Sequence, residues 1–269
     1  MIRKYLIITI TALLFAQVVV AQQKDTITIV PAKPRRAVSI NDFLGNQDEY
    51  KSFWDRNFSG HWSGFHLGIN SFLQKDYSAY PPSQDGFMNL KIWRSFSYQV
   101  NFWQKSISLQ RYHDAIGLVT GLGMCFDDYR FNPEVTIEAD ENGIIHPIYP
   151  GYEEMRKSKL STFYGRIPLL LEFQVPIGHF QRRFWMSGGV VFGYKLGSHT
   201  KLKYHQAGIS EKVKFRDELY LNDYRYSYTV RMGYRWFNVF AEYSPVPFFK
   251  DGHGPVLYPF TAGLTLVSF

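Results

Sequence analysis

The chain has 269 residues, among them 19 Tyr, 23 Phe and 6 Trp, and its net charge at pH 7 is +7. After the N-terminal segment no stretch approaches 18 consecutive apolar residues, which excludes a transmembrane helix there. The single cysteine, Cys125, excludes an intrachain disulfide. An ordinary soluble core does not need so many large rings, so the composition favours an aromatic-rich surface.

The first 21 residues have the layout of a secretory signal peptide. Arg3 and Lys4 provide a positive start, residues 6–15 form an uncharged apolar run, and Val19–Ala21 precede a cleavage site expected before Gln22. No cysteine lies near this site, which argues against a lipid anchor. Removing two of the 30 basic residues leaves a net charge of +5. Export makes nucleic-acid binding the weakest explanation of that charge.

The segment from residue 22 to residue 60 is polar and contains the basic stretch PAKPRR. We predict a periplasmic N-terminal segment, which is either a disordered leader or a docking site for a periplasmic partner. Residues 61–269 form the third predicted region. Their pattern is different, because apolar residues recur there at every second position.

This alternation is clearest in residues 115–126, AIGLVTGLGMCF, where large apolar residues oppose glycine and other small residues. A period of two predicts a strand with one apolar face. Similar patterns recur along the chain. They predict eight strands over residues 62–72, 90–102, 115–126, 163–173, 184–198, 225–235, 237–244 and 257–269.

The bulky parity of these strands carries almost no charge, whereas the other parity holds Gly, Ser, Thr and Asn with scattered charged residues. A soluble sandwich would bury its bulky face and expose a charged one. A membrane barrel instead has an apolar outer face and a polar interior, and its closure pairs every backbone group. We therefore predict an all-β, eight-stranded antiparallel up-and-down transmembrane β-barrel of the OmpA-like or OmpX-like kind.

The connections fit the same architecture. They are short after the second, fourth and sixth strands, and long after the first, third, fifth and seventh. Short periplasmic turns that alternate with long extracellular loops are typical of outer-membrane barrels, and an even strand number places both termini in the periplasm. The expected long loops cover residues 73–88, 128–160, 199–222 and 246–256.

An eight-stranded barrel is only wide enough for side chains to fill it. Glycines on the inner parity would then make room for long charged residues from other strands. One interpretation is a structural plug of ion pairs, since buried charges must be matched; the other is a polar gate or conduit. The predicted inward ionic set is Arg166, Glu172, Lys195, Arg225, Arg231, Arg235 and Glu242.

Two of the long loops are strongly charged. In the first, Asn142-Gly143 predicts a tight hairpin turn, so the third and fourth strands should continue beyond the membrane. Its acidic residues do not match the spacing of an EF-hand, which favours a solvated tip over a calcium site: Asp127, Asp128, Glu138, Asp140 and Glu141. The next loop is basic and would contact either anionic lipopolysaccharide or the acidic loop: Lys201, Lys203, Lys212, Lys214 and Arg216.

No GxSxG, HExxH or cysteine cluster is present, so we predict no catalytic residue, metal site or cofactor. The alternative of an outer-membrane lipase or protease would use residues near the outer rim. The candidates by residue type are His113, His253 and Ser198. Four aromatic residues are predicted in interfacial girdles: Trp93, Tyr129, Tyr164 and Trp236. Pro168 and Pro259 fall within predicted strands, where bulges or strand ends are needed to accommodate them.

The chain resembles the PorT-like outer-membrane β-barrel family of Gram-negative bacteria over residues 60–269. The resemblance rests on the stretches GFHLGIN, SYQVNF, GLVTGLG and YGRIPLLLEF and on the terminal Phe269. The resemblance implies a monomer in the outer membrane whose C-terminal strand is read by the barrel-insertion machinery. Its role would be structural or surface-interacting, in contact with outer-membrane lipid and lipopolysaccharide. The alternative is an accessory subunit of a secretion or gliding (type IX-like) assembly, with a periplasmic or secretion-system partner.

Overall fold

The computed structural model describes residues 58–110, 115–131, 135–149, 154–177, 183–206, 209–215 and 219–269. The predicted signal peptide, and nearly all of the predicted periplasmic segment, lie outside the described residues. Over these ranges the fold is all-β apart from two short 3-10 helices, η1 (Pro82–Gln84) and η2 (Ile92–Arg94). Within the described ranges, no helix is long and apolar enough to cross a membrane.

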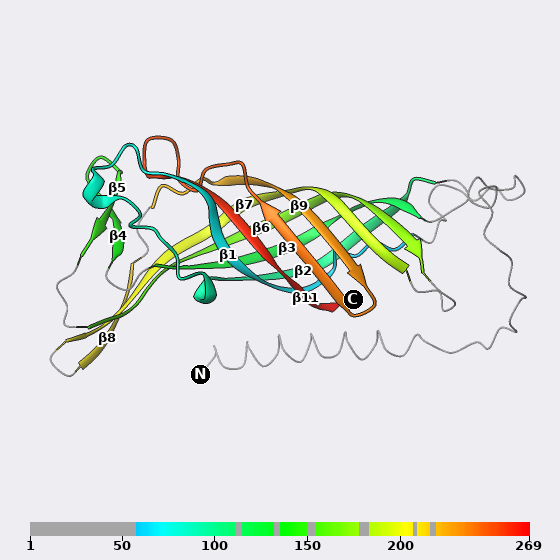
Figure 1. Cartoon of the computed structure of the whole chain (residues 1–269), viewed down its shortest axis with the longest axis horizontal. Coiled ribbons are helices and arrows are strands. Elements are labelled where there is room, and N and C mark those ends of the chain that lie inside the picture. Colours follow the sequence, from blue (N-terminus) through cyan, green and yellow to red (C-terminus); the bar gives the residue numbers. More distant parts are fainter. Residues whose placement is uncertain are drawn as a thin grey trace, which may run out of the picture. The chain divides into compact units, whose positions relative to one another are not determined.

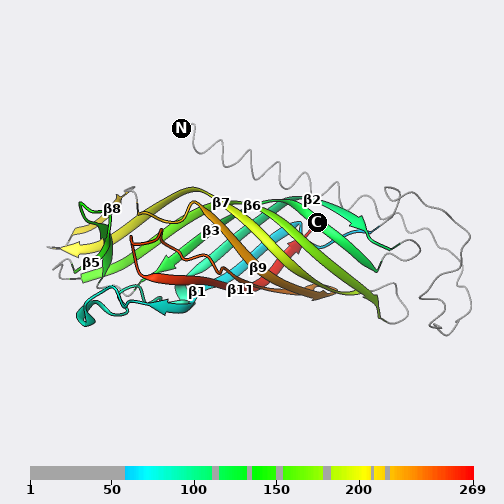
Figure 2. The ribbon, with the colours of Figure 1, turned by 90° about the horizontal axis from the view of Figure 1, so that it is seen from above.

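Eight strands form a closed antiparallel ring, in which β6 pairs with β7 and β11 pairs with β1. Strand β8 (Ile209–Phe215) pairs antiparallel with residues 200–206 of β7. Strand β4 (Thr136–Ala139) pairs with β5 (Ile145–Ile148) in a separate small sheet. Figures 1 and 2 show these three strands beyond one end of the ring strands. The ring strands are β1 (Gly64–Asp76), β2 (Phe96–Ser108), β3 (Ile116–Arg130), β6 (Glu154–Pro176), β7 (Arg183–Gln206), β9 (Tyr224–Tyr234), β10 (Phe237–Tyr243) and β11 (Val256–Ser268).

The predicted eight strands and their alternation of short and long connections are confirmed, with differences at the boundaries. Strand β2 begins at Phe96 rather than at residue 90, because residues 92–94 form η2. Strands β3 and β6 continue into the predicted loop between them, as expected, and β7 also continues past residue 198, to Gln206. Asn142-Gly143 does form a turn, with Gly143 at φ 77°, but this turn joins the separate strands β4 and β5 rather than β3 and β6.

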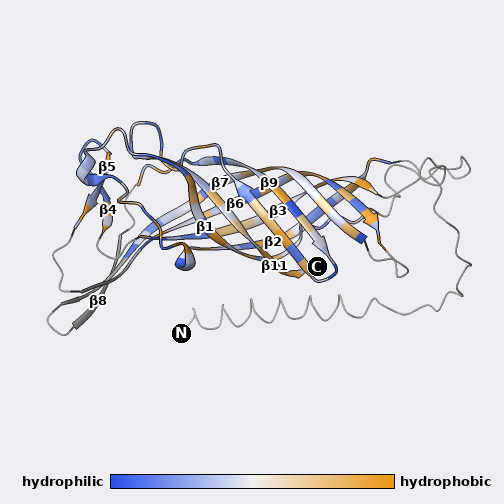
Figure 3. Cartoon of the chain, in the orientation of Figure 1, coloured by the Kyte–Doolittle hydropathy of each residue, from blue (hydrophilic) through white to orange (hydrophobic). Residues whose placement is uncertain are grey.

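Side chains alternate between the two faces of the ring as the sequence predicts. Leu122 (41% exposed), Phe192 (53%) and Val230 (47%) lie on the outer face, whereas their neighbours Val191 and Arg231 are buried inside. Figure 3 shows the corresponding alternation of apolar and polar residues along the ring strands. The large apolar residues of the predicted parity therefore point away from the interior.

The prediction of a bulge or strand end is wrong for Pro168 and confirmed for Pro259. Pro168 lies within β6, where the β3–β6 ladder lacks the pairs between Thr120–Leu169 and Gly123–Arg166 but keeps the same register on both sides. Pro259 is opposite Phe72, next to a bulge in β1. A further bulge, at Leu266, changes the parity of β11 so that Val267 is exposed like Leu264.

Candidate functional site

The interior at the short-turn end of the ring is filled by a segment that precedes β1. We call Phe58–Ser63 the entry segment. Phe58 and Trp62 are buried in one apolar cluster with Val119 of β3, Leu170 of β6 and Val191 of β7. Because these strands lie on one side of the ring interior and all present inward residues, the entry segment packs inside the ring.

Inward side chains also hold the backbone of the entry segment. Gln104 Oε1 accepts hydrogen bonds from the N–H groups of Trp62 (2.8 Å) and Ser63 (2.9 Å), and its Nε2 donates to the Gly60 carbonyl (2.8 Å). Glu172 accepts from the His61 N–H (3.0 Å) and contacts the His61 ring at 2.7 Å. Irregular backbone that leaves water needs such partners. Hydrogen bonds therefore fix the entry segment inside the ring, where it acts as a plug.

Two glycines of β3 make the space for this plug. A Cβ atom on Gly121 would lie 2.7 Å from the Trp62 ring, and one on Gly117 would overlap the Phe58 ring. The sequence predicts that small inner residues make room for long side chains. That prediction is confirmed, but at these two positions the occupants are rings of the entry segment rather than charged residues of other strands.

The middle of the interior is ionic. Arg166 donates to both carboxylate oxygens of Glu242 (2.6 and 2.7 Å), and Arg225 donates to Asp127 (3.2 Å). The guanidinium of Arg231 lies 4.9 Å from the centroid of the Trp62 ring and contacts the His66 ring at 2.9 Å. Within the described part of the chain, the Nε and Nη1 atoms of Arg231 have no hydrogen-bond partner.

Most of the predicted ionic set is brought together. Arg166, Glu172, Arg231 and Glu242 are buried, and Arg225 is largely buried. Lys195 lies nearer the long-loop end, where it contacts Asp223 at 2.7 Å. Hydrogen bonds from Lys195 and Lys250 lower the pKa of Asp223 below its usual value.

Arg235 does not belong to this set. It is exposed in the two-residue turn between β9 and β10 and has φ 60°. The prediction is wrong there because the strand ends at Tyr234, so the inward parity no longer applies. A second correction concerns Asp127, which was assigned to the acidic loop tip. It is buried and pairs with Arg225, because β3 continues through it to Arg130.

Apolar side chains close the long-loop end. The ring of Tyr129 stacks on Phe72 (5.3 Å between centroids) and meets Phe248 edge-on (4.9 Å). Tyr129 and Tyr164 are buried, so their predicted place in an interfacial girdle is wrong; Trp93 and Trp236 are exposed. The buried cluster comprises Phe72, Phe87, Met88, Tyr129, Phe131, Val135, Ile137, Ile145, Leu160, Leu219, Leu221, Phe248, Phe249 and Leu257.

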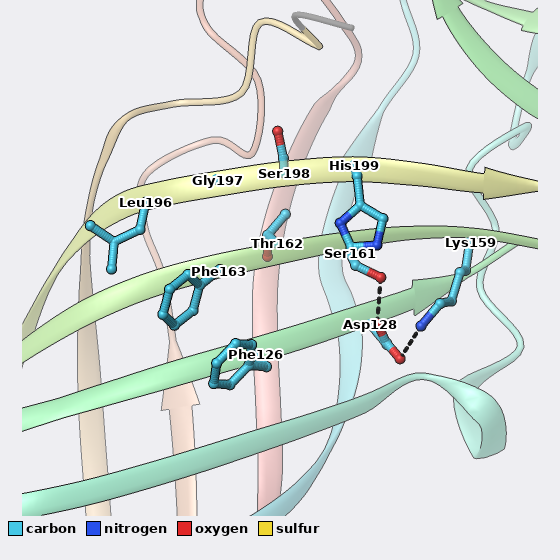
Figure 4. Close-up of a pocket in the computed structure, with 10 residues that line it drawn as sticks. All are labelled: Phe126, Asp128, Lys159, Ser161, Thr162, Phe163, Leu196, Gly197, Ser198 and His199. Atoms are coloured by element: carbon cyan, nitrogen blue, oxygen red, sulfur yellow. Dashed lines mark hydrogen bonds and ion pairs between the residues drawn. The ribbon is translucent and has the colours of Figure 1, made fainter. Parts of the chain in front are cut away.

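A pocket of about 520 Å³ lies at the surface where β3, β6 and β7 run side by side (Figure 4). Asp128, Ser161 and His199 are directly opposite one another on the three strands. Ser161 Oγ and Lys159 Nζ both donate to the Asp128 carboxylate, each at 2.5 Å. The stacked rings of Phe126 and Phe163 (4.2 Å between centroids) line the apolar part of the pocket.

No protein-family model, no curated protein and no solved structure matches this chain. The resemblance to PorT-like barrels therefore stays a prediction.

Ser, His and Asp side chains, the residue types of a hydrolytic triad, meet at this pocket. The hydroxyl of Ser161 is directed to a carboxylate without an intervening imidazole, so the order of a Ser-His-Asp triad is absent there. Ser198 and His199 project to opposite sides of β7 in Figure 4. His253 contacts the Gly143 carbonyl oxygen (2.9 Å) and stacks on Tyr220, and the third rim candidate, His113, lies outside the described residues.

The basic loop is largely strand. Lys201 and Lys203 belong to β7, and Lys214 and Lys212 of β8 are their respective partners in register. Arg216 lies outside the described residues. Among the side chains that the structure describes, no group of three or more His, Cys, Asp or Glu residues could hold a metal ion.

Proposed function

We propose that the chain is an outer-membrane β-barrel protein with a filled, non-conducting lumen, and that its role is structural or surface-interacting. The observation that supports this most strongly is the outer face of the closed ring. It carries large exposed apolar residues over an interior of buried ion pairs. Contiguous apolar surface of this kind marks a binding or membrane surface. Hydrocarbon would solvate it, and closure of the ring leaves no unpaired edge in lipid.

Strand lengths support the same proposal. A transmembrane strand needs about 9–11 tilted residues. Seven of the eight ring strands have 11 residues or more, and β10 has seven. The remaining length of β6 and β7 would project from the bilayer at the long-loop end.

We infer the orientation from the chain ends. Gly64 at the start of β1 pairs with Ser268 at the end of β11, so the ring begins and ends at the short-turn end. This end would face the periplasm and the long loops would face outward. The outward side chains of β11 would be available to the insertion machinery, as the resemblance to PorT-like barrels implies.

The test is electrophoresis of a membrane fraction before and after boiling. We expect the unboiled protein to migrate differently from the boiled protein, because a closed ring stays folded in detergent. We also expect it to resist extraction from the membrane at alkaline pH, because its apolar outer face would lie in hydrocarbon. Planar-bilayer currents should stay at background, since the entry segment and the apolar cluster fill the two ends. A protein that is extracted as a soluble species, with one mobility in both conditions, would contradict the proposal.

A substitution on the outer face separates a membrane ring from a soluble one. Val230 lies in the middle of β9 and is exposed. In water, arginine there should change the free energy of unfolding by no more than about 0.5 kcal/mol. In a bilayer we expect Val230→Arg to cost about 2–4 kcal/mol, measured by urea unfolding in lipid vesicles. The matched control is Tyr224→Arg at the end of the same strand, where the loss should be below about 1 kcal/mol. Equal small losses at both positions would count against a bilayer around β9.

A further inference from the structure

The pocket on the outer face of β3, β6 and β7 contains an open slot over Gly197. Phe126, Phe163 and Gly197 are directly opposite one another on the three strands. Because the rings of Phe126 and Phe163 are stacked at 4.2 Å, the other face of the Phe163 ring is turned toward β7. Among the described residues, no atom lies within 4 Å of a Cβ atom built on Gly197. The space beside this ring face is therefore open.

A bulge in β7 gives the slot an apolar end. Leu196 has no partner across β6, because the register of the β6–β7 ladder shifts at this point. Its side chain lies on the short-turn side of the slot, where Cδ1 would be 3.6 Å from a Cβ atom built on Gly165. Bulges of this kind redirect side chains and often adjoin functional sites. The volume of the whole pocket, about 520 Å³, lies within the usual range of small-molecule sites, about 300–1,000 Å³.

The other end of the slot is formed by an ion pair without net charge. The Asp128 carboxylate accepts hydrogen bonds from Ser161 Oγ and Lys159 Nζ. A carboxylate has about four lone-pair sites and an ammonium group has three N–H groups, so these contacts use only part of the capacity of the pair. The side chains of Asp128 and Lys159 are 29% and 17% exposed. This end therefore offers acceptors and donors side by side, with no excess charge to attract an ion.

A sugar ring matches both ends of the pocket. Figure 4 shows Phe126, Phe163 and Leu196 at one end and Asp128, Lys159 and His199 at the other. The C–H groups on the face of a sugar ring pack on the negative face of an aromatic ring, and its hydroxyls both donate and accept hydrogen bonds. A hydrocarbon chain would leave the polar end without partners, and an anion would meet the Asp128 carboxylate.

The pocket also lies at the border of the apolar outer face. Toward the short-turn end, the same three strands expose Leu122, Met124, Ile167, Leu169 and Phe192. In a bilayer this border is where hydrocarbon gives way to lipid head groups. We propose that the pocket binds the sugar ring of a neutral glycolipid, with the ring in the slot over Gly197 and its hydroxyls at the Asp128–Lys159 pair. The proposal rests on the proposed function, because the membrane supplies the lipid.

The test uses the full-length protein in micelles of an amine-oxide detergent, which carries no sugar. Three probes are titrated: a dioleoyl diglucosyl glycerolipid, a phosphatidylcholine with the same acyl chains, and maltose. We expect the wild-type protein to bind the glucosyl lipid about tenfold more tightly than either other probe. Equal binding of phosphatidylcholine would overturn the proposal in favour of a site for hydrocarbon chains. Equal binding of maltose would overturn it in favour of a soluble saccharide.

Three variants change one feature of the pocket each. Phe163→Leu removes the ring face but keeps an apolar side chain, and it should weaken binding of the glucosyl lipid about fivefold. Gly197→Leu fills the slot without removing a polar group and should weaken binding about tenfold through the clash. Asp128→Asn replaces a charged acceptor by a neutral one of the same size and should also weaken binding about tenfold.

Two matched controls make the same chemical changes outside the pocket. Phe192→Leu alters a ring of β7 that is 53% exposed, and Asp223→Asn alters the carboxylate paired with Lys195. Both should leave binding of the glucosyl lipid unchanged within about twofold. Equal weakening by Phe163→Leu and Phe192→Leu would overturn the proposal, because the lipid would then be held by the apolar outer face as a whole.

Mobility before and after boiling is measured on the same samples. If the wild-type protein shows the shift but binds the glucosyl lipid no better than phosphatidylcholine, the inference is wrong and the proposed function stands. If the shift is absent as well, both are wrong. A variant that keeps the shift has kept the ring of strands, so its loss of lipid binding is a loss of the site.

Discussion

Replacing Trp62 by alanine is expected to lower the free energy of unfolding by about 3–5 kcal/mol, although Trp62 belongs to no strand. Its side chain is fully buried in the entry segment and packs against Phe58 and Val119. Its ring also lies beneath Arg231, which has no carboxylate contact within the described residues. Removing the ring therefore leaves a cavity and a less favourable environment for a buried cation. The measurement is the folded fraction against urea concentration, read from mobility before boiling.

Trp93→Ala is the control for that measurement, because Trp93 is 80% exposed in η2, which precedes β2. Its loss should stay within about 0.5 kcal/mol. Bilayer currents of Trp62→Ala should stay at background, since the apolar cluster still closes the long-loop end. Equal stability of the two variants would show that the entry segment is not part of the packed interior.

The eight strands and their outward faces could be predicted because the alternation of side chains is a local property of extended backbone. Leu122 and Val230 are exposed simply because they share the parity of their bulky neighbours. The bulges could not be placed as easily. A bulge arises where the register between two strands shifts by one residue, as at Leu266. The register depends on both strands, so the pattern of one strand alone does not predict it.

The entry segment was missed for a different reason. Residues 58–60 were assigned to the polar N-terminal segment, and Trp62 and Ser63 were assigned to the first strand, which begins only at Gly64. The signal that could have found them was the pair Gly117 and Gly121, which left more space in β3 than the charged residues of other strands could fill. Matching that space to Phe58 and Trp62 requires the three-dimensional course of the chain.

Among the ionic residues, the alternation of side chains correctly predicted which residues point inward within the strands, but not at the strand ends. Arg231 and Arg235 have the same parity, but the turn after Tyr234 places Arg235 outside. Asp127 shares the parity of Gly123 and Cys125, so extending β3 by one more inward position would have placed it inside the ring, where it pairs with Arg225.

Changing Glu242 to glutamine is expected to lower the free energy of unfolding by about 3–5 kcal/mol, the usual loss when one partner of a buried ion pair is removed. Arg166 is 3% exposed, and its Nη2 donates to both oxygens of Glu242. The amide of the variant keeps the volume of Glu242 but supplies one acceptor and no charge. The guanidinium would then remain buried without compensation. Urea unfolding in detergent micelles measures the loss.

The double variant Glu242→Gln/Arg166→Met decides whether that loss comes from the unpaired cation. Because it removes the buried charge as well, it should be more stable than Glu242→Gln alone, and the non-additivity gives the coupling between the two residues. Asp223→Asn makes the same chemical change at a carboxylate that is 39% exposed and paired with Lys195, where about 0–1 kcal/mol is expected. If Glu242→Gln lost no more than Asp223→Asn, and the double variant gained nothing over it, water would have to reach Arg166. The interior would then be a wet conduit rather than a filled one.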